Sequence, residues 1–201
     1  MPNHDSLANI QTFRHDLYAC FGQRRDALFD LVDSLLTAGS CLSLAHLSLE
    51  APHRRGWGSL YAALRHGEIA GAALRTELTR PPLAEGEAIY AVAVSVWPRC
   101  DAETSPDCGF YYHPSRHSNG KPIVAGWADQ WIAQLSFARD SWTAPVDVQR
   151  GHPLQDANAT AVEQIKAGVA HFSTDDPTIP LFVFDAGYDP GALAQRSLFL
   201  R

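Results

Sequence analysis

Lysine is nearly absent from this sequence, since it occurs only as Lys121 and Lys166. The chain carries 16 basic and 22 acidic residues, for a formal net charge of -6. Binding to nucleic-acid phosphates needs a clustered excess of arginine and lysine, so this overall charge does not favour a simple basic DNA-binding module. The charge is uneven, however, because residues 1–80 are balanced and the acidic surplus lies in residues 81–201.

Cysteine and long apolar runs are also scarce. Four scattered cysteines exclude a disulfide-built scaffold; they are Cys20, Cys41, Cys100 and Cys108. No apolar run reaches about 18 residues, so no membrane span is expected. The polar start does not resemble a secretory signal, and we expect a cytoplasmic protein. Hydrophobic residues make up 46% of the chain, which indicates a globular fold.

The first part of the chain has the apolar periodicity of helices. Apolar residues recur at steps of three and four over residues 11–50, with a break at Gly39-Ser40, and again over 57–79. Pro81-Pro82 ends this pattern. We therefore expect a helical region over residues 1–82 and a second domain over 83–201.

The second part has the pattern of strands. A continuous β-branched and aromatic run predicts a buried strand over 88–97. Pro98 to Pro122 is expected to be a long irregular loop. Further strands are predicted over 123–137, 143–148 and 181–184, with an amphipathic helix over 156–171. This order favours an α/β fold, namely a mixed sheet with helices on its faces.

The last predicted strand leads into an acidic turn. Leu181 to Phe184 are apolar and are followed by Asp185, Gly187 and Asp189. A buried strand that ends in a carboxylate can present a metal ligand at the edge of a sheet. Alternatively, Asp185 caps the helix expected to start near Pro190. Asp189 is expected to be a turn or N-cap residue rather than a ligand.

Several unusual motifs now occur together in a characteristic order. They are Val94-Ser95-Val96-Trp97-Pro98-Arg99, Tyr111-Tyr112-His113-Pro114-Ser115-Arg116-His117, Gly126-Trp127 with Gln130-Trp131, and Phe184-Asp185-Ala186-Gly187-Tyr188-Asp189. With them, most of residues 11–190 resembles bacterial insertion-sequence transposases of the DDE type. The resemblance implies a ribonuclease-H-like catalytic domain, here partial, after an N-terminal helical region.

The resemblance also implies a chemistry, which is metal-dependent cleavage and strand transfer of DNA during transposition. In this family three carboxylates hold two divalent metals, usually Mg²⁺, for in-line phosphoryl displacement. Asp185 matches the second carboxylate. The first is expected where this chain has Ala93, and Asp101 and Glu103 lie beyond that strand. No residue matches the third, which is expected beyond Asp185 in a chain that ends at Arg201.

We therefore expect a truncated transposase copy that neither cleaves nor joins DNA. One aspartate is a weak site for Mg²⁺, which loses its water reluctantly. The alternative is a non-catalytic fragment that recognises transposon ends and interferes with intact transposase. DNA is the expected partner in both cases, and a homo-oligomer is left open.

The loop between Pro98 and Pro122 has a further candidate site. Cys100, Cys108, His113 and His117 are zinc-ligand types, but their spacing is not that of a usual zinc finger. The alternatives are a solvated polar loop or a loop that contacts DNA phosphates; its candidate contacts are His113, Arg116, His117 and Lys121.

Basic pairs in the helical region are the other candidate DNA contacts. Arg54-Arg55 is the main pair and Arg24-Arg25 the second, although such pairs are often solvated helix faces. Three tryptophans are predicted to pack in the core of the sheet, namely Trp127, Trp131 and Trp142. Asp129 is expected to face outward. Ser95 and Ser136 have no recognisable triad partners, so a hydrolase is not supported.

Overall fold

The computed structural model describes residues 4–40, 43–79, 89–113, 122–136, 143–169 and 179–197. Contacts divide the chain into two compact units, Met1–Glu77 and Leu78–Arg201, and each is described by itself below. The predicted boundary between residues 82 and 83 lies outside the described residues. None of the described helices combines the length and hydrophobicity needed to cross a membrane.

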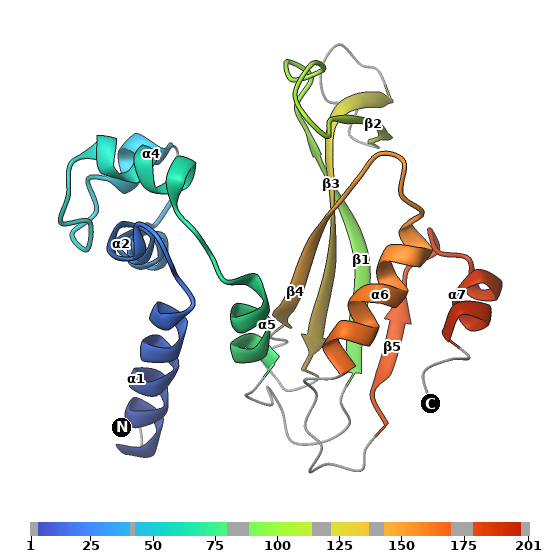
Figure 1. Ribbon diagram of the computed structural model, residues 1–201, viewed down its shortest axis with the longest axis horizontal. Helices are drawn as coiled ribbons and strands as arrows, with labels where there is room; N and C mark the ends of the chain where they lie inside the picture. The colour runs from blue at the N-terminus through green and yellow to red at the C-terminus, as the bar shows by residue number, and fades with distance from the viewer. Residues whose placement is uncertain are drawn as a thin grey trace. The chain divides into compact units, whose positions relative to one another are not determined.

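The first unit is helical (Figure 1), as its apolar periodicity predicts. Arg14 forms a two-pronged ion pair with Asp33, at 2.7 and 2.9 Å, which ties the first helix to the second. Leu31, Leu47 and Leu60 form one of its small buried clusters. The helices are α1 (His4–Ala19), α2 (Arg25–Thr37), α3 (Leu44–Leu47), α4 (Trp57–His66) and α5 (Gly71–Thr79).

The helical stretch predicted over residues 57–79 is helical at both ends but interrupted in the middle, so two helices occupy this range. α4 ends where the Gly67 N–H donates to the Ala63 carbonyl at 2.7 Å. Beyond it, the carbonyl of Glu68 accepts from the Gly22 N–H, and the Ala70 N–H donates to Cys20, both at 2.8 Å. These bonds to a distant segment replace the helical hydrogen bonds of Glu68–Ala70, which sequence periodicity cannot reveal.

The second unit is built on a mixed sheet, and the predicted α/β fold class is confirmed. β3 pairs antiparallel with β1 along one edge and with β2 and β4 along the other, while β5 pairs parallel with β1. The strands are β1 (Ile89–Pro98), β2 (Gly109–Tyr112), β3 (Ile123–Leu135), β4 (Thr143–Gly151) and β5 (Leu181–Phe184), and the helices are α6 (Ala157–Val169) and α7 (Pro190–Ser197).

β2 corrects the expectation that residues 98–122 are irregular throughout. Its four residues pair with the start of β3, and the His113 N–H donates to the Pro122 carbonyl at 2.8 Å. So short a segment among proline, serine and aspartate gives little local signal. β2 forms a strand because the first residues of β3 lie beyond the end of β4, and their backbone groups pair with β2 instead.

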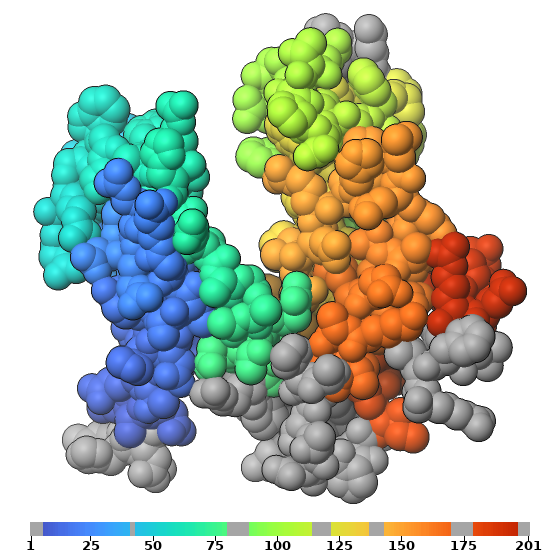
Figure 2. Space-filling view, in the orientation of Figure 1, coloured from blue at the N-terminus to red at the C-terminus, as the bar shows by residue number. Residues whose placement is uncertain are grey.

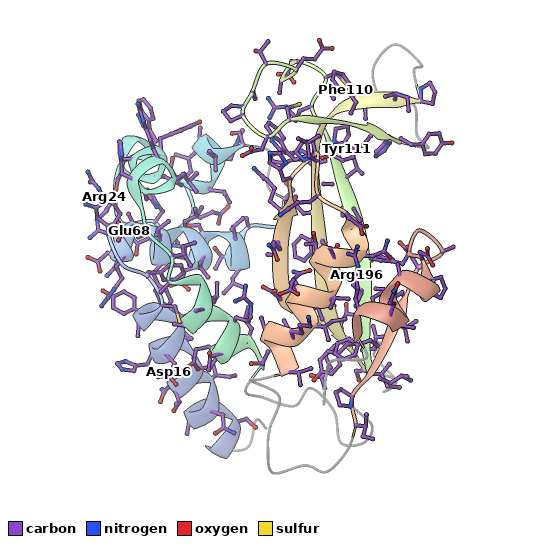
Figure 3. All side chains as sticks on the ribbon, turned by 45° about the vertical axis from the view of Figure 1, so that its right-hand side comes forward. Asp16, Arg24, Glu68, Phe110, Tyr111 and Arg196 are labelled. Carbon is purple, nitrogen blue, oxygen red and sulfur yellow. The ribbon has the colours of Figure 1, made fainter. Side chains whose placement is uncertain are left out.

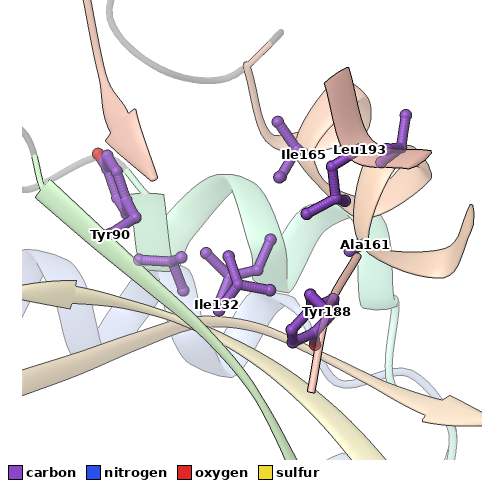
Figure 4. Close-up of a cluster of buried hydrophobic side chains, with 9 residues drawn as sticks. Tyr90, Ile132, Ala161, Ile165, Tyr188 and Leu193 are labelled. Atoms are coloured by element: carbon purple, nitrogen blue, oxygen red, sulfur yellow. The ribbon is translucent and has the colours of Figure 1, made fainter. Parts of the chain in front are cut away.

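The core of the second unit lies between one face of the sheet and α6 (Figures 1 and 4). In the space-filling view α6 forms the orange near surface of this unit (Figure 2). Tyr90 and Ile132 lie on the sheet side of this cluster with Ala161 and Ile165 of α6, and Val92 belongs to the same cluster. Phe182 and Phe184 of β5 pack on the same cluster. Alternation along the strands therefore fixes which residues face away from α6.

That opposite face carries two of the three tryptophans predicted to lie in the core, Trp127 and Trp131. Trp127 faces Trp97 across the strand pair with ring centroids 5.8 Å apart, and Trp131 is 38% exposed. The prediction is wrong for these two rings, because among the described residues the core cluster covers only the α6 side. Trp142 lies outside the described residues.

Candidate functional site

The turn after β5 holds Asp185 in a defined position. Asp185 Oδ1 accepts a hydrogen bond from the Gly187 N–H at 2.8 Å, which closes a local turn. A Cβ at Gly187 would lie 3.0 Å from the same oxygen, so glycine permits this close approach. The following Tyr188 is buried in the core and anchors the turn (Figure 4). Asp185 itself is exposed.

The register of β1 and β5 identifies the neighbour of Asp185. Ala91 pairs with Val183 and Val92 with Phe184 in parallel register. This second pair is the last of the register, and Ala93 and Asp185 are the next residues of the two segments. Val92 and Phe184 face the core, so position 93 faces the opposite side of the sheet, where Ala93 is exposed. The residue that follows the last β1–β5 pair on β1 is thus an alanine, which cannot bind a metal.

Asp129 is the acidic residue that β3 contributes near this position. It pairs with Ser95 in register, two residues beyond Ala93 on β1. Its Oδ1 lies 3.4 Å from Arg150 Nε on β4, and its side chain is 21% exposed. Asp129 therefore faces away from the core, as expected, and its charge is partnered by arginine.

Asp189 caps α7, which confirms its predicted role. Its Oδ1 accepts hydrogen bonds from the N–H groups of Gly191 at 2.8 Å and Ala192 at 3.3 Å. Its own N–H donates to Asn158 Oδ1 of α6 at 2.9 Å. The alternative in which Asp185 caps this helix is therefore wrong, since the Asp185 carboxylate bonds within its own turn.

The residues that the structure describes do not form a two-metal site. Such a site needs several convergent oxygen ligands. Among the described residues, no group of three or more histidine, cysteine, aspartate or glutamate side chains could hold a metal ion. Asp185 offers one carboxylate, one oxygen of which already accepts a hydrogen bond, and Ala93 offers none.

The loop candidates are only partly described. Cys100 and Cys108 are free thiols, and Arg99 is paired with Asp101 through two hydrogen bonds of 3.0 Å. His113 directly follows β2, and its backbone N–H still bonds to the Pro122 carbonyl beside β3. Arg116, His117 and Lys121 lie outside the described residues, so their predicted DNA contacts remain predictions.

Arg54 and Arg55 form ion pairs with α2. Arg54 Nη2 lies 2.9 Å from Asp30 Oδ1, and Arg55 lies 3.4 Å from Asp30 and 3.1 Å from Asp26. The Asp30 carboxylate is buried, with 3% of its side chain exposed. A hydrogen bond from the Tyr18 hydroxyl, followed by those from Arg55, lowers the pKa of Asp26. Sequence reasoning missed these acidic partners, although Asp26 and Asp30 have the i, i+4 spacing of one helix face.

The fold and this turn define a class: an α/β protein in which an aspartate follows a strand parallel to the first strand of a mixed sheet. The family model for DDE superfamily endonuclease matches residues 16–198. Because the match covers most of the chain, this protein belongs to that family, and its predicted DDE transposase-like nature is confirmed. The family indicates nuclease or transposase-type activity with divalent metal ions on DNA. No curated protein matches the chain.

Proposed function

We propose that this protein is a transposase-family member that binds DNA without cutting it. The observation that supports the proposal is the register of β1 and β5, in which Ala93 and Asp185 each directly follow the last pair, Val92 and Phe184. An aspartate at both positions would give two adjacent carboxylates. With alanine at one of them, the negative charge and the oxygen ligands needed to dehydrate a magnesium ion are missing.

The two parts of the chain have different roles in this proposal. Residues 83–201 keep the scaffold of the catalytic domain, in which Asp185 corresponds to the second carboxylate. Residues 1–82 hold DNA through Arg54 and Arg55, which are fixed by carboxylates of α2. Fixed guanidinium groups lose little freedom when they bind phosphate, and their planar donors match its oxygens.

A plasmid assay tests this function. Supercoiled plasmid is incubated with the wild-type chain and Mg²⁺ or Mn²⁺, and nicked and linear forms are separated on a gel. A band-shift assay in the same buffer reports binding. We expect a shifted band and no nicking above the level without protein. Asp185→Asn is the matched control, and it should behave as the wild type does in both assays.

Nicking by the wild type that is lost in Asp185→Asn would contradict the proposal, because Asp185 would then be catalytic. Absence of DNA binding by the wild type at moderate salt would also contradict the proposal. Recognition of transposon ends is a second candidate role, since the Arg54 side chain is 75% exposed although it is paired with Asp30. Binding that prefers one duplex sequence over a scrambled one would support that role, and equal binding would refute it.

A further inference from the structure

Three arginines converge on one hollow in the first unit. This arginine pocket has a volume of about 330 Å³, near the lower end of the range for ligand sites. It lies where α2 begins and close to the first turn of α4. Its lining residues are Arg24, Arg25, Asp26, Ala27, Arg55 and Ser59.

The arginine side chains are held in different ways. Arg55 is fixed by Asp26 and Asp30. The Arg25 guanidinium donates through Nε to the Phe21 carbonyl and lies 5.2 Å from the ring centroid of Tyr18. Both groups are thus oriented before any ligand arrives, which reduces the entropy lost on binding.

Arg24 differs from the other two. It is exposed on the surface of the unit (Figure 3), and no side-chain partner accepts from it among the described residues. Its backbone is fixed, because its carbonyl accepts from the N–H groups of Ala27 and Leu28 at 3.1 and 3.0 Å. Its φ of 60° lies in the left-handed region, which is unusual for arginine. Among the described residues, Arg24 is therefore the pocket arginine whose guanidinium has no side-chain partner.

The charges around the pocket do not cancel. The described lining holds three arginines, Arg24, Arg25 and Arg55, and one carboxylate, Asp26, so the lining itself carries an excess of two positive charges. The lining includes one hydroxyl, from Ser59, and no large apolar side chain. A peptide ligand usually needs apolar side-chain contacts, whereas phosphate needs charge and hydrogen-bond donors.

We infer that the arginine pocket binds phosphate groups of a DNA backbone. The inference rests on the proposed function, which supplies DNA as the ligand. Arg25 and Arg55, whose guanidinium groups are already held in position, form the fixed part of the site. Arg24, whose guanidinium is not held, adds a further contact to phosphate. A contact of this kind positions the duplex and carries no sequence information by itself.

The test uses fluorescence anisotropy of a fluorescein-labelled duplex of about 20 base pairs, measured on the full chain at several salt concentrations. Arg24→Asn removes the charge, and asparagine tolerates the left-handed backbone. We expect affinity to fall about 3- to 10-fold and the slope of log K against log salt to become shallower by about 1. Arg65→Gln is the matched control, because Arg65 lies on α4 outside the pocket lining and should change neither quantity.

Asp26→Asn provides a second variant with the opposite expected effect. It removes a negative charge from the pocket lining, so duplex affinity should rise severalfold. A purely structural role for this cluster would not increase affinity. Circular dichroism melting of all variants identifies any loss of fold.

The outcomes separate the pocket from the proposed function. If the wild type binds duplex but Arg24→Asn and Arg65→Gln have equal effects, the pocket inference is overturned and the proposed function stands. If the wild type does not bind duplex, the proposed function fails. In that case, calorimetric titration with inorganic pyrophosphate tests whether the pocket binds free phosphate. Pyrophosphate binding that is lost in Arg24→Asn supports such a site. No binding of pyrophosphate by the wild type overturns the pocket inference.

Discussion

Tyr188 offers a direct probe of the turn that holds Asp185. Its ring packs against Phe184 with centroids 5.2 Å apart, and the residue is 7% exposed. Its hydroxyl is buried and has no hydrogen-bond partner in the described structure. Burial, and secondarily the negative charge of Asp185, raises the pKa of Tyr188 to about 12. The folded protein therefore resists ionisation of this phenol.

The sign of the resulting pH dependence follows from linkage. Below pH of about 10 the phenol is neutral in both states, and its contribution is fully present. Between about 10 and about 12 the unfolded chain loses the proton first, so the free energy of unfolding falls. The full loss is about 3 kcal/mol, of which about 2 kcal/mol should appear by pH of about 11.5.

Urea unfolding of wild type and Tyr188→Phe at pH of about 8 and about 11.5 measures this loss. At the lower pH the variant should be equal or slightly more stable, because it removes an unpaired buried hydroxyl. At the higher pH it should gain about 2 kcal/mol relative to wild type, since titration of all other groups cancels. Asp185→Asn should reduce the wild-type loss. A stability difference that is the same at both pH values would refute the reasoning.

Two further substitutions test the packing of the second unit. Gln164 Nε2 donates to Asp147 at 3.1 Å, and the side-chain amides of Gln164 and Gln130 contact each other at 2.7 Å, with both glutamines buried. Gln164→Leu should cost about 2 kcal/mol in urea unfolding, and the double variant with Gln130→Leu should cost less than the sum of the two single variants; strict additivity would refute this. A Cβ at Gly126 would lie 2.1 Å from the Trp97 carbonyl oxygen, so Gly126→Ala should lower the melting temperature strongly. Gly151→Ala, where the nearest atom is at 3.4 Å, is the control and should have little effect; equal melting temperatures for the two would refute the argument.

The sequence predicted the elements whose signal is local and strong. β1, β3 and β5 are continuous apolar or β-branched runs, and α6 has a clear amphipathic pattern. It also placed Asp185 directly after its strand and Asp189 at the cap of a helix.

The features that were missed depend on distant partners. β2 exists because β3 offers an edge, and the break after α4 because residues near Cys20 bond to it. The ion pairs of Arg54 and Arg55 join residues 24 to 29 positions apart. The exposed position of Trp131 depends on which face of the sheet α6 covers, and the local sequence does not indicate that face.

The central claim is that alanine at position 93 removes the metal site, and a Mn²⁺ titration tests it most directly. Electron paramagnetic resonance measures free Mn²⁺ in the presence of wild type, Ala93→Asp and the uncharged control Ala93→Asn. Parallel strands lie about 4.8 Å apart, so an aspartate at 93 would bring a second carboxylate next to Asp185. We predict that Ala93→Asp binds Mn²⁺ at least about 10-fold more tightly than the other two proteins, an effect lost when Asp185→Asn is added. Equal Mn²⁺ affinity of wild type and Ala93→Asp would contradict the account.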